Sequence, residues 1–92
     1  MANYVYIIQS LADNSFYKGY SENPLQRLAQ HNDKSSHYTA SKAPWKMVYV
    51  ELCESKTFAL KREKALKKYF HAQIEQLILS HKNILSSFYN SG

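Results

Sequence analysis

The stretch YVYIIQSLADNSFYKGY, residues 4–20, decides the fold because it predicts two strands joined by a short turn. Both arms are dense in Tyr, Val, Ile and Phe, which favour strands, and LADN at residues 11–14 contains the turn formers Asp and Asn. Whether the loop has two or four residues, antiparallel pairing places the following on one face of the sheet: Tyr4, Tyr6, Ile8, Tyr17 and Gly19. That face therefore carries at least three tyrosines.

The next segment, SENPLQRLAQHND at residues 21–33, predicts a helix that begins at a proline. Asn23 is the expected N-cap, and Pro24 takes the first helical position, where its missing N–H costs nothing. Arg27 and His31 are four residues apart, so they share a side of the helix, which we expect to face outward. The inner side is predicted to carry Leu25, Leu28, Ala29 and Asn32.

The remainder of the chain predicts a loop, a strand and two helices. The loop is KSSHYTASKAPW at residues 34–45, polar and interrupted by a proline, and it carries Lys34, His37, Tyr38 and Lys42. The strand is KMVYVELCE at residues 46–54. Ser55 can cap a helix from Lys56 to about Tyr69, and HAQIEQLILSHKN at residues 71–83 predicts another, with Ile74, Leu77 and Ile78 inward.

The predicted order is β-β-α-β-α-α. It indicates the α+β class, with a small three-stranded antiparallel sheet flanked by helices. The 92 residues, 45% of them hydrophobic, suffice for one core. We therefore predict a single domain over residues 1–83 and leave the tail, residues 84–92, undecided.

The basic segment LKREKALKK, residues 60–68, contains a single acid, Glu63. Glu63 repeats at helical spacing with Ala59, Leu66 and Phe70, so its carboxylate is expected within the apolar stripe. An inward carboxylate is costly unless an arginine, a hydrogen-bond network or a metal ion binds it, and the pattern leaves these three open. The lysines expected on the opposite side are Lys61, Lys64 and Lys68.

Composition indicates which class of molecule the protein binds and in which cellular compartment we expect it. The formal net charge of +5 favours a polyanion such as nucleic acid, although a basic helix is also typical of a solvated surface. The lone cysteine, Cys53, suits a reducing cytoplasm, and without a signal-peptide pattern or a long apolar run we expect no membrane association. Walker, GxGxxG and HExxH motifs are missing, and the histidines lack paired spacing, so nucleotide-cradle and zinc chemistry are not indicated.

The ordered motifs YVYI, YKG, PLQRLAQHN, YT and LKREKALKK resemble the GIY-YIG nuclease family, in its short, stand-alone bacterial branch, over nearly the whole chain. Tyr4 stands where the family name has a glycine, and Lys18 where it has an isoleucine. The resemblance implies an endonuclease that hydrolyses DNA phosphodiester bonds with Mg²⁺ or Mn²⁺, in repair or recombination. It implies structured or damaged DNA as substrate, no small-molecule cofactor, and room for a protein partner in targeting.

The same resemblance implies a role for each site residue. Glu63 would be the metal ligand, and Tyr6 would deprotonate or orient the attacking water. Tyr17 would support the site or the scissile phosphate, and Arg27 would neutralise phosphate charge. His31 would accept a proton or contact the phosphate.

Three lysines, Lys18, Lys42 and Lys46, are expected to line a DNA groove near the tyrosines. The C-terminal asparagine of the family is not assignable between Asn83 and Asn90. Two alternatives remain: a nucleic-acid binding module that keeps the nuclease fold without efficient cleavage, and a protein-interaction domain whose basic helix meets an acidic protein.

Overall fold

The computed structural model describes residues 2–33 and 39–90 of the chain. The strands are β1 (Asn3–Ser10), β2 (Phe16–Ser21) and β3 (Trp45–Cys53). The helices are α1 (Pro24–Asn32), the 3-10 turn η1 (Ala40–Lys42), α2 (Lys56–Leu66), α3 (His71–Ile78) and α4 (Leu85–Asn90). The predicted α+β class and the predicted order are confirmed, with η1 and α4 as additional short helices.

The three strands form one antiparallel sheet in the order β2-β1-β3, so β1 is central and β2 is an edge. Tyr6 lies opposite Gly19 and Ile8 opposite Tyr17, which confirms the predicted tyrosine face. The hairpin closes with the four-residue loop, because the Ser10 N–H donates to the Ser15 carbonyl at 2.9 Å. Within that loop Asn14 has a φ of 64°, a left-handed conformation that asparagine adopts more readily than most residues.

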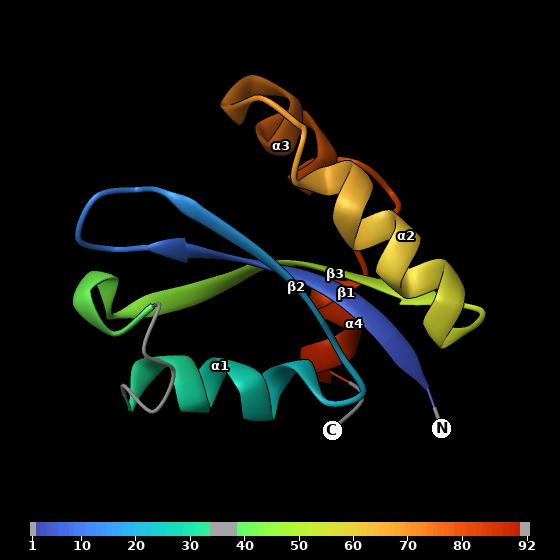
Figure 1. Cartoon of the computed structure of the whole chain (residues 1–92), viewed down its shortest axis with the longest axis horizontal. Helices are drawn as coiled ribbons and strands as arrows, with labels where there is room; N and C mark the ends of the chain where they lie inside the picture. The colour runs from blue at the N-terminus through green and yellow to red at the C-terminus, as the bar shows by residue number, and fades with distance from the viewer. Residues whose placement is uncertain (1, 34–38, 91–92) are drawn as a thin grey trace.

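Helices cover both faces of the sheet, α2 and α3 on one and α1 and α4 on the other (Figure 1). Alternate residues of β1 serve the two cores, because side chains in a strand point to opposite faces in turn. The core under α2 and α3 contains Val5, Ile7, Tyr49, Cys53, Ala59, Leu66 and Ile74. The core toward α1 and α4 contains Tyr6, Ile8, Trp45, Met47 and Val50.

The start of α1 forms as predicted, but its inner side differs. The Asn23 side chain accepts a hydrogen bond from the Gln26 N–H, and Pro24 begins the helix. The outward position predicted for His31 is wrong, since this side chain is 0% exposed, and Ala29, predicted inward, is exposed. His31 tolerates burial because both ring nitrogens have hydrogen-bond partners, which a helical period does not reveal.

Helix α2 also begins as predicted, with the Ser55 side chain accepting from the Phe58 N–H. It ends at Leu66, before the predicted end at Tyr69, and α3 likewise ends early, at Ile78. Phe70 is therefore the extended N-cap of α3, 77% exposed, and its predicted place in the apolar stripe is wrong. The residues exposed as predicted are Lys61, Lys64 and Lys68.

Parts of the predicted loop and of the undecided tail pack against the rest of the structure. In the predicted loop, Lys34, His37 and Tyr38 lie outside the described residues, whereas Thr39 is buried ahead of η1. In the undecided tail, α4 packs against β3, and Ile84 and Leu85 border the core toward α1. In the described part of the chain, no helix has the length and apolarity needed to cross a membrane.

Candidate active site

A hydrogen-bonded chain links β1, α1 and the segment before η1. The Tyr6 hydroxyl lies 3.0 Å from Nε2 of His31, and Nδ1 of His31 lies 2.7 Å from Oγ1 of Thr39. The indole N–H of Trp45 donates to the Thr39 carbonyl at 3.0 Å and so holds this residue in place. Tyr6, His31 and Thr39 are all buried, which keeps the chain away from competing water.

Gly19 makes the position of Tyr6 possible. The Tyr6 ring crosses strand β2 at Gly19, where a side chain would collide: an added Cβ would lie 2.6 Å from both Cζ and Oη of Tyr6. Glycine at this cross-strand position therefore allows the phenol to reach His31 over the edge strand.

Tyr17 joins the same cluster from β2. Its ring centroid lies 5.0 Å from that of His31 in an edge-on arrangement, and 6.5 Å from that of Tyr6. Trp45 packs against it from β3 with a centroid separation of 6.4 Å. These ring contacts fix the half-buried Tyr17 beside the hydrogen-bonded chain.

Arg27 adds positive charge to this cluster. Burial raises the pKa of Tyr6 to about 12, and a hydrogen bond from the Arg27 guanidinium and its charge oppose that rise. Burial also lowers the pKa of His31 below its usual value, and the charge of Arg27 lowers it further. At neutral pH the phenol is therefore protonated and the imidazole neutral, a pair between which a proton can be shared.

Glu63 approaches from α2, on the other side of the sheet. Its side chain is 18% exposed, and Oε2 lies 3.1 Å from Nζ of Lys67, one helical turn on. The arginine of this helix, Arg62, instead pairs with Glu51 on β3 at 3.1 Å. The charge of Glu63 raises the pKa of Tyr6, after burial and Tyr17, so the carboxylate is within electrostatic reach of the phenol despite coming from the opposite layer.

The two layers meet at the β2 edge of the sheet. A cavity there is lined by Phe16, Tyr17, Lys18 and Lys67, so it borders both the tyrosine cluster and the partner of Glu63. Among the described strands β2 pairs with β1 alone, so it forms an edge of the sheet. The arrangement brings Tyr6, Tyr17 and His31 into direct contact, with the charge of Arg27 acting on Tyr6 and His31, and places Glu63 across the edge strand from them.

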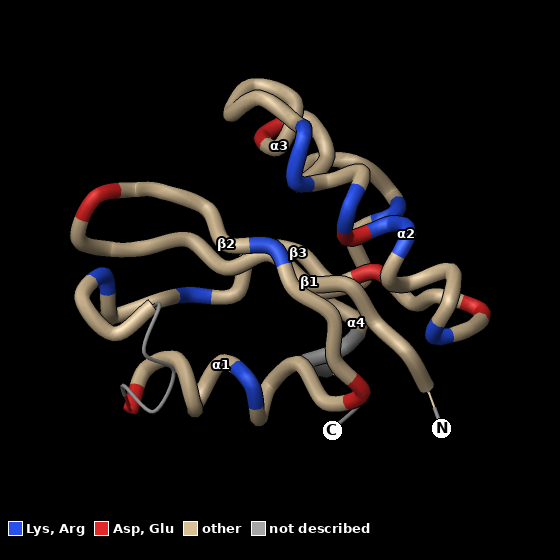
Figure 2. Tube along the Cα trace, viewed as in Figure 1, with Lys and Arg blue, Asp and Glu red and all other residues tan. Residues whose placement is uncertain are grey.

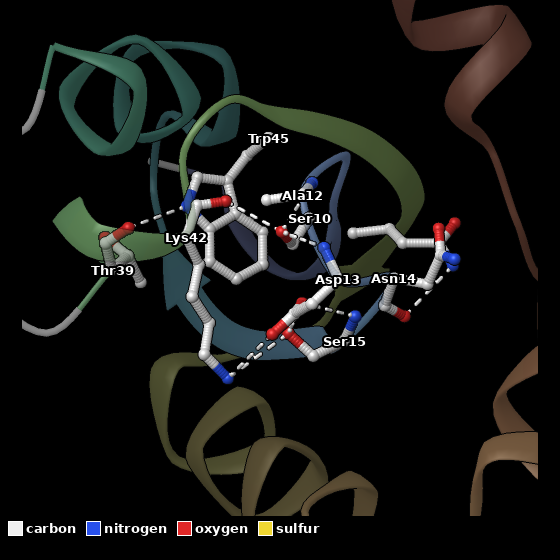
Figure 3. Close-up of polar contacts among 9 residues, drawn as sticks. Ser10, Ala12, Asp13, Asn14, Ser15, Thr39, Lys42 and Trp45 are labelled. Carbon is white, nitrogen blue, oxygen red and sulfur yellow. Dashed lines mark hydrogen bonds and ion pairs between the residues drawn. The ribbon is translucent and has the colours of Figure 1, made fainter.

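Two of the three lysines expected beside the tyrosines lie elsewhere. Lys42 donates to Ser15 and pairs with Asp13 at 3.4 Å, while its carbonyl accepts from Ser10, so it anchors the hairpin loop (Figure 3). Lys46 lies on a separate groove with Val48, Ile78 and Asn83. The cause is strand alternation, since Lys46 points to the face opposite Trp45 and Met47. Lys18 borders the cavity at the β2 edge.

Three structural residues of the site were not identified from the sequence. Thr39 and Trp45 complete the chain from His31, and Asn32 accepts from the Trp45 N–H at 2.6 Å and donates to its carbonyl at 2.9 Å. The dipeptide YT of the family resemblance contained Thr39 without indicating its partner. A partner eight positions away across a loop has no periodic signature, so no pattern in one sequence could have found it.

A divalent cation fits the donor chemistry of Glu63. Among the residues that the structure describes, no group of three or more His, Cys, Asp or Glu side chains could hold a metal ion. A single carboxylate with retained waters and substrate oxygens is nevertheless enough for Mg²⁺ or Mn²⁺. Lys67 shows that this carboxylate attracts a cation, and an ion pair one helical turn apart on a helix surface contributes only about 0.3–0.5 kcal/mol, so a divalent ion can displace the largely exposed lysine.

Comparison with known proteins decides the family. The model of the GIY-YIG catalytic domain matches residues 2–76. The chain belongs to the GIY-YIG nuclease family. Among its GIY-YIG relatives, a UPF0213 protein of Syntrophus aciditrophicus is 40% identical over 78 residues, covering 83% of this chain and 88% of the relative. A UPF0213 protein of Staphylococcus haemolyticus is 39% identical over 77 residues, covering 83% of this chain and 93% of the relative.

A solved structure shares this GIY-YIG fold. The solution structure of a UPF0213 protein from Bacillus halodurans superimposes with a TM-score of 0.56 at 29% sequence identity. The match covers 89% of this chain and 87% of the other. The predicted GIY-YIG membership is thus confirmed by the sequence and by the fold.

Proposed function

We propose that this protein is a divalent-metal-dependent endonuclease that hydrolyses DNA phosphodiester bonds, acting in the cytoplasm on structured or damaged DNA in repair or recombination. The observation that carries the proposal is the contact cluster of Tyr6, Tyr17 and His31, with Arg27 and Glu63 in electrostatic reach. Family membership supports the nuclease class. The single buried thiol, Cys53, fits a reducing compartment.

The residues of the cluster divide the work of hydrolysis. In the tautomer whose Nδ1–H donates a hydrogen bond to Oγ1 of Thr39, Nε2 of His31 carries no proton and can accept the one on the Tyr6 hydroxyl, whose oxygen lies 3.0 Å away. Tyr6 then becomes able to take a proton from, or orient, the attacking water, which a phenol with a pKa of about 12 does poorly alone. Because His31 is buried and bonded at both nitrogens, a proton-accepting role suits it better than contact with the phosphate.

The second requirement of hydrolysis is that the negative charge on the phosphate be neutralised. Arg27 would neutralise the developing negative charge from the α1 side, and Tyr17 would support the scissile phosphate. Glu63 would hold Mg²⁺ or Mn²⁺ from the α2 side, with Lys67 displaced from it. The bound ion would supply Lewis-acid stabilisation of the transition state and of the leaving oxygen.

A cleavage assay tests the proposal. Purified protein is incubated with plasmid and with branched DNA in Mg²⁺ or Mn²⁺, beside a Glu63→Ala variant and a sample in chelator. We expect nicked or resolved products from the unmodified protein, and loss of at least about 100-fold in rate for the variant. Equal cleavage by both proteins would identify a contaminating nuclease and remove the basis of the proposal.

A second candidate is a binding module that keeps this fold with little cleavage. It is favoured by the burial of Tyr6, whose hydroxyl is already bonded to His31, and by the ion pair that occupies Glu63. The same assay separates the two candidates when DNA binding is measured beside it. Binding that weakens with salt, with no metal-dependent product, would support this second function.

A further inference from the structure

We propose that the cavity at the β2 edge binds one unpaired nucleotide next to the scissile phosphate, so that the substrate is DNA with a single-stranded segment, such as a flap or a fork. This inference rests on the proposed nuclease function, whose substrate class it specifies. The residues that line the cavity come from strand β2 and from the C-cap of α2.

The lining of the cavity matches the chemistry of a nucleotide. Its volume is about 490 Å³, within the range of small-molecule sites, and its lining combines two aromatic residues, Phe16 and Tyr17, with two lysines, Lys18 and Lys67. Single-stranded nucleic acid is bound by this combination, because bases stack on aromatic rings while lysines contact the phosphates. Basic residues continue along α2 beyond the cavity (Figure 2).

The aromatic part of the cavity is held in place by packing. Phe16 packs against the core under α2 and α3, and its ring centroid lies 4.5 Å from that of His71 at an interplanar angle of 36°. Tyr17 is held by its contacts with His31 and Trp45 on the other face of the sheet. The two rings therefore border the cavity from opposite faces of β2, and because packing already fixes each of them, little conformational entropy is lost when a base stacks on either.

The position of the cavity selects an unpaired base. Tyr17 belongs to both the tyrosine cluster and the cavity, and Lys67 pairs with Glu63, so a phosphate between Tyr17 and Glu63 has its neighbouring nucleotide at the cavity. A base stacked inside a duplex has to be extruded before it can enter, at a cost of a few kcal/mol. An already unpaired base enters without that cost.

Two further cavities formed by the described residues lack this combination. One contains Glu22 beside Tyr20 and Lys56, and its carboxylate would repel a phosphate. The other, which includes Lys46, Met47 and Asn83, has no aromatic lining residue. The pairing of two rings with two lysines therefore distinguishes the cavity at the β2 edge.

The test measures binding without cleavage, in a Glu63→Gln background and in chelator. Two DNA duplexes are compared, one blunt and one with a short unpaired tail that carries the fluorescent base 2-aminopurine. We expect tighter binding of the tailed duplex and quenching of 2-aminopurine as it stacks. Phe16→Leu, which keeps an apolar side chain, and Lys67→Gln should each weaken binding of the tailed duplex roughly tenfold. Lys82→Gln, an exposed charge outside the cavity, is the matched control and should not.

The outcomes separate this inference from the proposed function. Equal affinity for blunt and tailed DNA, or unchanged quenching in a folded Phe16→Leu variant, would overturn the nucleotide site even if the unmodified protein cleaves DNA. If Phe16→Leu does not fold, as judged by circular dichroism, the exposed Lys67 decides: unchanged affinity of Lys67→Gln would overturn the site. A preference for tails without metal-dependent cleavage would support the site and refute the nuclease proposal.

Discussion

Gly19 is the residue on which the geometry of Tyr6 depends most sharply. In Gly19→Ala the new Cβ would overlap the end of the buried Tyr6 ring, with Cζ and Oη at 2.6 Å, so the ring has to move away from His31. We expect the free energy of unfolding to fall by about 1–3 kcal/mol and DNA cleavage to fall with it. Urea denaturation and the cleavage assay measure the two effects, and an alanine variant with unchanged stability and rate would contradict this placement of Tyr6.

His31 should give the protein a stability that depends on pH. Burial, and then the charge of Arg27, lower its pKa in the folded state, so between that pKa and the usual value of about 6.5 the unfolded chain binds a proton that the folded chain does not. The contribution of neutral His31 to the free energy of unfolding is therefore complete when the pH is above the usual pKa, and it declines as the pH falls below that pKa. Urea midpoints at neutral and mildly acidic pH should differ less for His31→Gln than for the unmodified protein. Equal differences would show that His31 titrates normally.

At the scale of elements, the β1–β2 hairpin and the starts of two helices could be predicted from the sequence. Alternation and turn residues predicted the hairpin and its face, and the caps at Asn23 and Ser55 predicted where α1 and α2 begin. Helix ends and the inward side of α1 were missed, because burial of His31 depends on Tyr6 and Thr39, which are distant in the chain. The helical period predicts that apolar residues lie inward. It does not identify a polar residue that is buried because its hydrogen-bond partners come from other elements.

At the scale of elements, Asn83 joins β3 and α3 to α4, the helix that the sequence left unassigned. Its side chain accepts from the Val50 and Leu85 N–H groups and donates to the Val48 and Ile78 carbonyls, so it ties β3 to the ends of α3 and α4. Asn83→Ala leaves these partly buried backbone groups unpaired and should lower the free energy of unfolding by about 1–3 kcal/mol.

The cleavage rate of the folded Asn83→Ala variant should stay near that of the unmodified protein, since these bonds serve the supporting layer. Chemical denaturation and the rate per folded molecule are the two measurements. A large loss of rate in a fully folded variant would instead make Asn83 the family's catalytic asparagine.

The whole molecule presents its charge unevenly. The formal net charge is +5, and basic residues follow α2 beside the cavity at the β2 edge (Figure 2). We expect affinity for DNA to fall linearly on logarithmic axes with salt concentration, with a slope of about −2 to −4 for a few phosphate contacts. Fluorescence anisotropy titrations at several salt concentrations measure it. Affinity that does not respond to salt would favour the protein-interaction alternative over a nucleic-acid interface.

The sandwich of two helical layers explains why the site was only partly predictable. A sheet buried on both faces separates Glu63 from the tyrosine cluster, and one edge strand, β2, is where the two sides meet. The residue types came from the family motifs, whereas their meeting point depends on the twist and packing of three strands and two helices, which no local pattern encodes.

The central claim is that Tyr6 and Glu63, from opposite layers, act in one reaction centre. The most direct measurement is the single-turnover cleavage rate of branched DNA in Mn²⁺ for Tyr6→Phe, Glu63→Gln and the double variant. Residues that act as a unit are not additive, so the double variant should be about as slow as the slower single variant. A double variant slowed by the product of the two single effects, or single variants that cleave normally, would contradict the account.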